Sequence, residues 1–332
     1  MSRGTRHTLV LVVLLVLCTS TLGAQSGSPF LGRWALTIPG GGAGWLGVVQ
    51  KDGKLSAGIL WGGGSVEPVS DIKLEGDKLV VTRIHESQQR GTKTTSTETI
   101  TATLDGNNLK LTTVTKRPDG SLTKPADFTG KKIPPLPGKP DLSKVKFGAP
   151  ILLFEGKSLE AWKLTDPGAK SGWSIENGVL VNKPVQQEGQ PHVNYGNLRT
   201  VAEFQDFNLK LEVNVAKGEN SGVYLRGLYE VQVCDSYGKK LDSHNMGGIY
   251  SRITPTENAE KAPGEWQTMD LTLVDRHATV ILNGKKIIDN EPLLGCTGGA
   301  LTSDEFKPGP IYLQGDHTGI KYRNIVLTPV VK

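Results

Sequence analysis

The chain has 332 residues, of which 37% are hydrophobic and 21% are charged. This composition is too apolar for a disordered chain and too polar for a protein with many membrane spans, and the length suits two domains. With 41 glycines, 19 prolines and no Gly-X-Y repeat, the sequence favours a turn-rich all-β protein over collagen or a helical bundle. The net charge of +5 falls to +3 without Arg3 and Arg6, so no nucleic-acid partner is indicated.

Residues 1–24 have the three parts of a secretory signal peptide. Arg3 and Arg6 precede an unbroken apolar run at residues 9–17, and small residues follow up to Ala24. The run is too short to span a bilayer, so we expect a secreted or periplasmic protein with no membrane span in the mature chain. Cys18 follows a leucine where a lipid-attachment site needs a small residue, so a lipoprotein is not favoured.

Two cysteines, Cys234 and Cys296, remain in the expected mature chain. In an oxidising compartment they could pair, and the bond would stabilise the fold by closing a long loop. Neither lies in a dense cysteine framework, so two buried free thiols are equally compatible with the sequence. No cysteine and histidine spacing indicates a zinc site.

Residues 131–148 contain four prolines and predict a linker between two domains. Before it, residues 28–130 alternate apolar and polar side chains, with turn signals such as Asp52-Gly53 and Asp105-Gly106. About eight short strands predict a small antiparallel barrel or meander. Its Gly32-Arg33-Trp34 start resembles that of lipocalin-like barrels. No nucleophile, base and orienting group occur together here, so we interpret this half as a binding or scaffolding domain.

Residues 149–332 are also rich in alternating strands. Asn177-Gly178 and Asn283-Gly284 separate apolar runs, which is a strong hairpin signal, and no long run has helical periodicity. About a dozen strands predict a two-sheet jelly roll. Because the proline-rich linker separates the halves, we expect this half to fold alone and to hold the whole functional site.

The densest polar group lies in residues 221–235. Alternation directs Arg226, Glu230 and Gln232 to one sheet surface, with Asp235 close by. The simpler interpretation is a solvated outer face with a cross-strand ion pair worth about 0.2–1 kcal/mol. The tyrosines on the same face favour a ligand-binding groove instead.

A second polar group follows the strand-like residues 311–314. Gln314 lies on the polar face of this strand, and a glycine-flanked loop then presents Asp316 and His317, with Arg323 further on. Tyr250, after a pair of glycines, is a third candidate. Aromatic rings beside amides and carboxylates suit a sugar-binding site, although a histidine at a loop tip is often merely exposed.

These segments, in this order, resemble the 3-keto-disaccharide hydrolase family of secreted bacterial proteins. The resemblance covers the C-terminal half, leaves the N-terminal barrel outside, and implies a concanavalin-like or laminin-G-like jelly roll. The matching stretches are LFEGKSLEAW (153–162), WSIENGVL (173–180), FQDFNLKLEV (204–213), NSGVYLRG (220–227), YEVQVCD (229–235), GGIY (247–250), GEWQTMDL (264–271), LNGKKI (282–287) and IYLQGDHTGIKYRNI (311–325).

The resemblance implies cleavage of glycosides or disaccharides whose sugar is already oxidised at C3, a substrate that a sugar 3-dehydrogenase would supply. The ketone acidifies the C2 proton, so a base can remove it. The resulting enediolate expels the C1 substituent, and water can then add to the unsaturated sugar. Such a site needs a base, an oxyanion stabiliser and an acid for the leaving group.

On this resemblance, Glu230 or Asp235 would be the base, Arg226 and Gln232 would hold the keto and hydroxyl oxygens, and His317 would be the acid. No cofactor is certain, but a divalent metal on Glu230, Asp235 or His317 could stabilise the enediolate instead of Arg226. The remaining substrate-binding candidates are Tyr250, Gln314 and Arg323.

Two other classes of function stay open. A jelly roll can be a carbohydrate-binding module that does no chemistry. It can also be an ordinary glycosidase of the laminarinase type, but the expected ExDxxE-like strand is not visible in this sequence.

Overall fold

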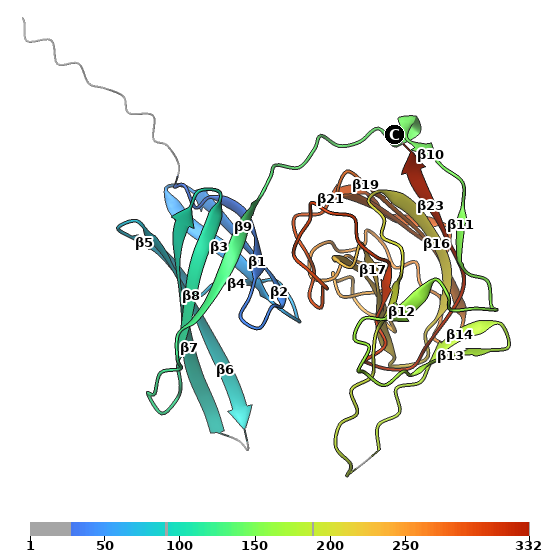
Figure 1. The fold of residues 1–332 in the computed structure, drawn as a ribbon, viewed down its shortest axis with the longest axis horizontal. Coiled ribbons are helices and arrows are strands. Elements are labelled where there is room, and N and C mark those ends of the chain that lie inside the picture. The colour runs from blue at the N-terminus through green and yellow to red at the C-terminus, as the bar shows by residue number, and fades with distance from the viewer. Residues whose placement is uncertain (1–27, 90–91, 188, 332) are drawn as a thin grey trace, which may run out of the picture.

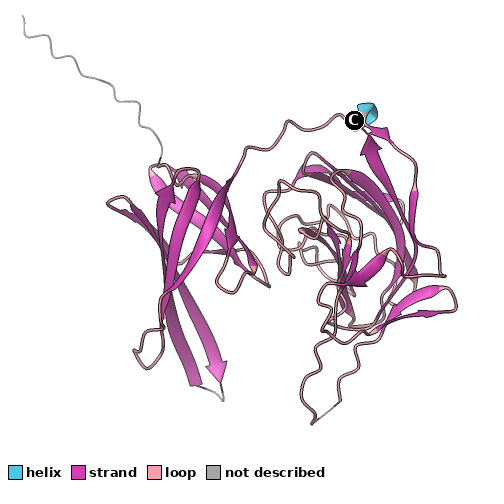
Figure 2. Ribbon diagram, viewed as in Figure 1, coloured by secondary structure: helices cyan, strands magenta, loops and turns pink. Residues whose placement is uncertain are grey.

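The structure is a computed structural model that describes residues 28–89, 92–187 and 189–331. The predicted signal peptide therefore lies outside the described residues. The described chain is almost entirely strand and loop, which confirms the all-β prediction (Figure 2). Its one helix is a single 3-10 turn, η1 (Leu142–Lys144), and no described helix has the length and apolar character to cross a membrane.

The N-terminal domain is one antiparallel sheet of nine strands in the order β4-β3-β2-β1-β9-β8-β7-β6-β5 (Figure 1). Backbone hydrogen bonds from Val69 to Ala57 and from Ser70 to Thr82 join its two ends, so the sheet curls around a core that includes Trp34. The strands are β1 (Gly32–Thr37), β2 (Ala43–Lys51), β3 (Lys54–Trp61), β4 (Glu67–Pro68), β5 (Asp71–Glu75), β6 (Lys78–Gln89), β7 (Thr92–Asp105), β8 (Asn108–Lys116) and β9 (Ala126–Ile133).

The predicted hairpins of this domain are present. Asp52-Gly53 joins β2 to β3, and Asp105-Gly106 joins β7 to β8. Asp52 and Gly53 both have positive φ values, 49° and 75°, which fit the twist of a two-residue hairpin turn. The local turn chemistry therefore decides which strands are neighbours.

The linker is shorter than predicted at both ends. Strand β9 continues to Ile133, and β10 (Lys146–Phe147) already pairs with the last strand of the chain, β23 (Ile320–Val331). The connecting segment is thus residues 134–145, which contain the four prolines and η1.

The C-terminal domain is the predicted two-sheet jelly roll. Its larger sheet has the order β13-β14-β23-β16-β19-β20-β21, with β10 and β11 also paired to β23, and its smaller sheet has the order β12-β15-β22-β17-β18. The strands not yet given are β11 (Ile151–Phe154), β12 (Trp162–Leu164), β13 (Trp173–Glu176), β14 (Val179–Asn182), β15 (Leu198–Thr200), β16 (Phe207–Asn214), β17 (Asn220–Leu225), β18 (Tyr229–Cys234), β19 (Trp266–Val274), β20 (His277–Leu282), β21 (Lys285–Pro292) and β22 (Tyr312–Leu313).

One apolar core lies between these two sheets. Val223 and Val231 of the smaller sheet and Leu209 and Leu271 of the larger sheet are all fully buried in the same cluster. Alternation along β17 and β18 therefore sends their remaining side chains to the opposite, outer face of the smaller sheet. That outer face holds the polar residues described next.

Cys234 and Cys296 are free thiols, so the disulfide alternative is wrong. The sulfur of Cys234 lies 3.4 Å from the carbonyl oxygen of His244, whereas Cys296 faces the N-terminal domain, 3.7 Å from the carbonyl oxygen of Gly44. Burial raises the pKa of Cys234 to about 11 and that of Cys296 to about 12. Both thiols are therefore protonated and unreactive at neutral pH.

Candidate active site

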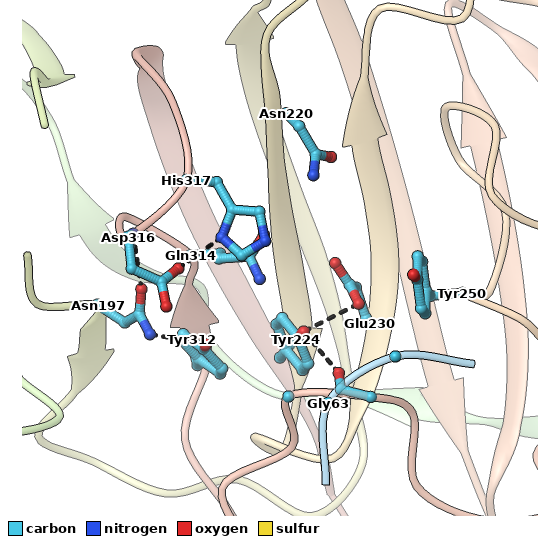
Figure 3. A pocket seen from close by; sticks show the side chains of 13 residues that line it. Gly63, Asn197, Asn220, Tyr224, Glu230, Tyr250, Tyr312, Gln314, Asp316 and His317 are labelled. Carbon is cyan, nitrogen blue, oxygen red and sulfur yellow. Dashed lines mark hydrogen bonds and ion pairs between the residues drawn. The ribbon is translucent and has the colours of Figure 1, made fainter. Parts of the chain in front are cut away.

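A cavity of about 300 Å³ lies on the outer face of the smaller sheet, at the small end of the range for ligand pockets. Figure 3 shows polar and aromatic side chains converging on it from several segments. Glycines of both domains, Gly63, Gly64, Gly298 and Gly299, form one side. The side chains that line the cavity are those of Asn197, Asn220, Tyr224, Glu230, Tyr250, Tyr312, Gln314, Asp316 and His317.

Strand register brings the central residues together. Tyr224 on β17 lies opposite Glu230 on β18 and opposite Tyr312 on β22. The rings of Tyr224 and Tyr312 stack with centroids 4.2 Å apart and an interplanar angle of 20°. The stacking holds both rings in place, and their hydroxyl groups bond to two other residues of the cavity, Glu230 and Asn197.

Glu230 is the carboxylate at the base of the cavity, and its residue is only 4% exposed. Burial raises the pKa of Glu230 to about 8, although Tyr224 and His317 oppose the shift. Glycine at 222 makes room for it, because a Cβ atom there would lie 2.3 Å from Glu230 Oε1. A carboxyl group with this pKa is a stronger base than an ordinary glutamate once it is ionised.

The hydroxyl group of Tyr224 lies between Glu230 and one of the cavity glycines. Its oxygen lies 2.9 Å from Glu230 Oε2 and 2.8 Å from the carbonyl oxygen of Gly298. A hydroxyl has one hydrogen to donate, and its donation to Glu230 favours the ionised carboxylate, which is why Tyr224 opposes the rise in the pKa of Glu230. Tyr224 therefore holds the Glu230 carboxylate in position at the base of the cavity.

Asp316 and His317 form a second titratable pair at the rim of the cavity. His317 Nδ1 lies 2.8 Å from Asp316 Oδ1, and this hydrogen bond raises the pKa of His317 above its ordinary value. Burial opposes ionisation of Asp316, but the bond from His317 keeps the pKa of Asp316 below its usual value. Asn197 fixes the loop, because its Oδ1 accepts from the backbone N–H groups of Gly315 and Asp316, at 2.6 and 3.1 Å.

Two of the amides that line the cavity, Asn220 and Gln314, have side-chain oxygens that are buried without a partner in the described chain. An unpaired buried acceptor is costly unless a ligand or water donates to it. Together with Tyr250, which packs edge-on against His244, these amides suit a ligand with several hydroxyl groups.

The cavity brings together four of the residues proposed from the sequence, namely Glu230, His317, Tyr250 and Gln314. The alternative of a solvated outer face is wrong, since Arg226, Glu230 and Gln232 are 0%, 4% and 5% exposed. Among the described residues, Arg226 and Glu230 form no ion pair with each other. The outer face is covered by loops rather than by solvent.

Arg226 and Gln232 do not line the cavity, contrary to prediction. Strand β17 ends at Leu225, and Arg226 has a φ of 59°, so alternation no longer sets its direction. Its guanidinium donates to the backbone carbonyls of Glu305, at 2.8 Å, and Lys307. Gln232 does follow Glu230 in alternation, but residues 247–248 pair with its backbone and its side-chain oxygen accepts from Val233.

Asp235 and Arg323 also lie elsewhere. Asp235 follows the end of β18, and its carboxylate accepts from the backbone N–H of Gly218 at 2.9 Å. Arg323 lies on β23 of the larger sheet, where it pairs with Glu212 and stacks over Trp266 at 4.0 Å. Neither residue can touch a ligand in this cavity.

The suggested metal set of Glu230, Asp235 and His317 does not fit, because Asp235 is engaged outside the cavity. Within the described residues, no group of three or more His, Cys, Asp or Glu side chains is arranged to hold a metal ion.

Sequence reasoning missed several residues of the cavity. Tyr224 and Tyr312 had a signal, because alternation places them on the same face as Glu230 and Gln314. No sequence signal marks Asn197 or the glycines at 63–64, because only long-range packing brings their loops to the sheet. The wall from the N-terminal domain also corrects the expectation that residues 149–332 hold the whole site.

Comparisons with solved structures give weak overall similarity. Two glycosyl hydrolase-like proteins of Parabacteroides distasonis are 30% and 27% identical, with TM-scores of 0.44 and 0.40. The first match covers 59% of this chain and 93% of that chain, and the second covers 54% and 98%. The endo-β-1,3(4)-glucanase SCLam is 12% identical over 58% of this chain and 93% of that chain, with a TM-score of 0.35. No curated protein matches significantly.

The family comparison is specific. The sequence model of the 3-keto-α-glucoside-1,2-lyase-like domain matches residues 149–328, which is nearly all of the jelly roll and more than half of the chain. The match contains Glu230, the Asp316–His317 pair and the stacked rings of Tyr224 and Tyr312, and it indicates a carbohydrate-active, glycosidase-like protein. The chain therefore belongs to the 3-keto-α-glucoside-1,2-lyase-like family, which is the resemblance that its sequence motifs predict.

Proposed function

We propose that the protein cleaves 3-keto-glycosides or 3-keto-disaccharides by removing the C2 proton and eliminating the C1 substituent, followed by hydration. The observation that carries this proposal is the buried Glu230, whose pKa is raised to about 8 at the base of a polar, sugar-sized cavity. Ordinary two-carboxylate hydrolysis needs a second carboxylate across the scissile bond. The other carboxylate that lines this cavity, Asp316, is already paired with His317.

In the first step, the Glu230 carboxylate takes the proton from C2, and the electron pair forms an enediolate with negative charge on the C3 oxygen. Tyr312 is placed to stabilise this charge. Its hydroxyl oxygen accepts from Asn197 Nδ2 at 2.9 Å, so its own proton can be donated to a ligand oxygen.

In the second step, the C3 carbonyl re-forms, a C1=C2 double bond forms and the C1–O bond breaks. His317 donates a proton to the leaving oxygen, because Asp316 favours its protonated form. Water then adds across the double bond: Glu230 returns its proton to C2, the hydroxyl joins C1, and His317 takes up the remaining proton. Both residues return to their starting states.

The requirement for a ketone provides the test. Purified protein should release the aglycone from 3-keto-α-glucosides and leave the unoxidised parent glucosides nearly untouched, because only a neighbouring carbonyl makes C2 acidic. In D₂O, deuterium should appear at C2 of the product or of recovered substrate, which mass spectrometry measures. Comparable turnover of unoxidised glucosides contradicts the mechanism, and saturable sugar binding without turnover favours a binding module.

We further propose that the protein is exported and acts after a sugar 3-dehydrogenase, since the ketone must be made by oxidation of a sugar hydroxyl. The basic, apolar and small-residue order of residues 1–24 supports export. Mass spectrometry of the exported protein should find Gln25 as its first residue. Retention of Met1 on an intracellular protein contradicts this proposal.

A further inference from the structure

A loop of the N-terminal domain, residues 62–65, reaches the cavity of the C-terminal domain. It connects β3 to β4, and Gly63 and Gly64 line the cavity beside Gly298 and Gly299. Figure 3 shows Gly63 on a blue ribbon, the colour of the N-terminal segment, next to Tyr224 and Glu230. The candidate site is thus built from both domains.

Direct contacts hold this loop in place. The backbone N–H of Gly299 donates to the carbonyl of Gly62 at 3.2 Å, and Ser65 Oγ lies 2.8 Å from His244 Nε2. The backbone N–H of Val66 donates to Ser251 Oγ at 2.8 Å. A Cβ atom on Gly298 would lie 2.1 Å from the carbonyl oxygen of Gly64, so the two glycine backbones are in close contact.

A buried interface behind the loop fixes it further. Trp45 of β2 is 8% exposed, and the Arg252 guanidinium lies 4.5 Å from its ring centroid. Ala43, Trp45 and Leu60 belong to the same hydrophobic cluster as the jelly-roll core. The loop is therefore a fixed wall of the cavity.

We propose that the N-terminal domain is a specificity element, in which residues 62–65 close one end of the cavity and limit the ligand to a terminal sugar unit with a short substituent. This inference rests on the proposed function, because it takes the ligand to be a 3-keto-glycoside. A cavity of about 300 Å³ that ends at a fixed wall has no path for a long glycan chain to continue in that direction. Sites that cleave within a polymer need a groove open at both ends.

Gly63 allows a direct test, because a side chain there occupies space without straining the backbone. A Cβ atom at Gly63 meets no other atom within 4 Å, and the φ of Gly63 lies outside the left-handed region, unlike those of Gly62 and Gly64. Gly138 in the connecting segment has the same two properties, is exposed and lies outside the cavity lining. It is the matched control position.

In the full chain, Gly63→Trp should lower kcat/KM for a 3-keto-α-glucosyl disaccharide by roughly tenfold or more, and that for methyl 3-keto-α-glucoside by much less. Gly138→Trp should match the wild type with both substrates. An equal loss on both substrates, or no loss on either, overturns the proposal. Should the tryptophan variant fail to fold, Gly63→Leu serves for the same comparison.

A labelling experiment separates this inference from the proposed function. At pH 7.5 iodoacetamide should react little with the half-buried Cys234 and the buried Cys296, whose thiols are protonated, so the thiol introduced by Gly63→Cys can be followed by peptide mass spectrometry. A 3-keto-α-glucosyl disaccharide should slow its labelling, and it should leave that of Gly138→Cys unchanged. Protection without wild-type turnover supports the wall and contradicts the proposed function. Wild-type turnover without protection overturns the wall alone.

Discussion

Replacing Glu230 with Gln should lower turnover of 3-keto-glucosides by roughly 10²–10⁴-fold, the usual range for loss of a general base. Glutamine keeps the size of the side chain and can still hydrogen bond to Tyr224, but it cannot take a proton from C2. Aglycone release and deuterium incorporation at C2 should fall together, because both depend on the same proton transfer. Steady-state kinetics and mass spectrometry measure the two quantities on one preparation.

The pH dependence of stability gives the same variant a second measurement. The pKa of Glu230 is about 8 in the folded protein and about 4.5 in an unfolded chain, so the folded state binds the proton more tightly. The stabilisation from this protonated carboxyl is complete below pH 4.5 and is lost as pH rises towards 8. Relative to Glu230→Gln, the wild-type free energy of unfolding should fall by about 1.4 kcal/mol per pH unit across this window.

A surface carboxylate provides the control. Glu176 on β13 pairs with Lys183 at 2.7 Å, and its side chain is 43% exposed. Glu176→Gln should leave turnover unchanged. A Glu230→Gln protein that turns over at the wild-type rate removes Glu230 from the chemistry, and a stability difference independent of pH contradicts the raised pKa.

Arg226→Leu should destabilise the protein by about 1–3 kcal/mol, the range for leaving buried hydrogen-bonding groups without their partner. Arg226 is fully buried, and its guanidinium donates to the carbonyl oxygens of Glu305 and Lys307. Leucine would leave both carbonyls without this donor. Urea unfolding followed by fluorescence measures the change.

The KM of this variant shows whether Arg226 stabilises the fold or binds the substrate. Because Arg226 lies outside the cavity, the folded fraction of Arg226→Leu should bind 3-keto-glucosides with the wild-type KM. Arg226→Lys, which keeps a donor and a charge, should recover part of the lost stability. A raised KM with unchanged stability would mean that the sequence-based role of Arg226 as a substrate ligand is correct.

Local sequence chemistry predicts much of this fold. Asn177 and Gly178 have φ values of 51° and 79°, which is the hairpin geometry that an Asn-Gly pair favours. Alternation correctly directs Glu230 to the face of the sheet opposite that of its neighbour Val231, which faces the apolar core. It fails at Arg226 because the strand ends one residue earlier, and the sequence does not mark that end.

Long-range packing is harder to predict from sequence. Proline-rich residues 134–145 suggest two independent halves, yet Trp45 packs into the jelly-roll core. A signal for this does exist in β1 to β3, where neighbouring residues such as Trp45 and Leu46 are both apolar and both buried, on opposite faces. A strand with two apolar faces needs a second partner, but alternation alone cannot identify it.

The wall formed by Gly63 and Gly64 means that the chemistry of the site and the size of its ligand depend on different parts of the chain. The groups proposed to transfer protons, Glu230 and His317, belong to the jelly roll, whereas Gly63 and Gly64 belong to a different domain and line the cavity with backbone alone. A substitution at Gly63 changes the shape of the cavity without changing the identity of the base. Ligand length and reaction chemistry can therefore vary independently in this architecture, so that one jelly roll could serve substrates of different size when joined to different N-terminal domains.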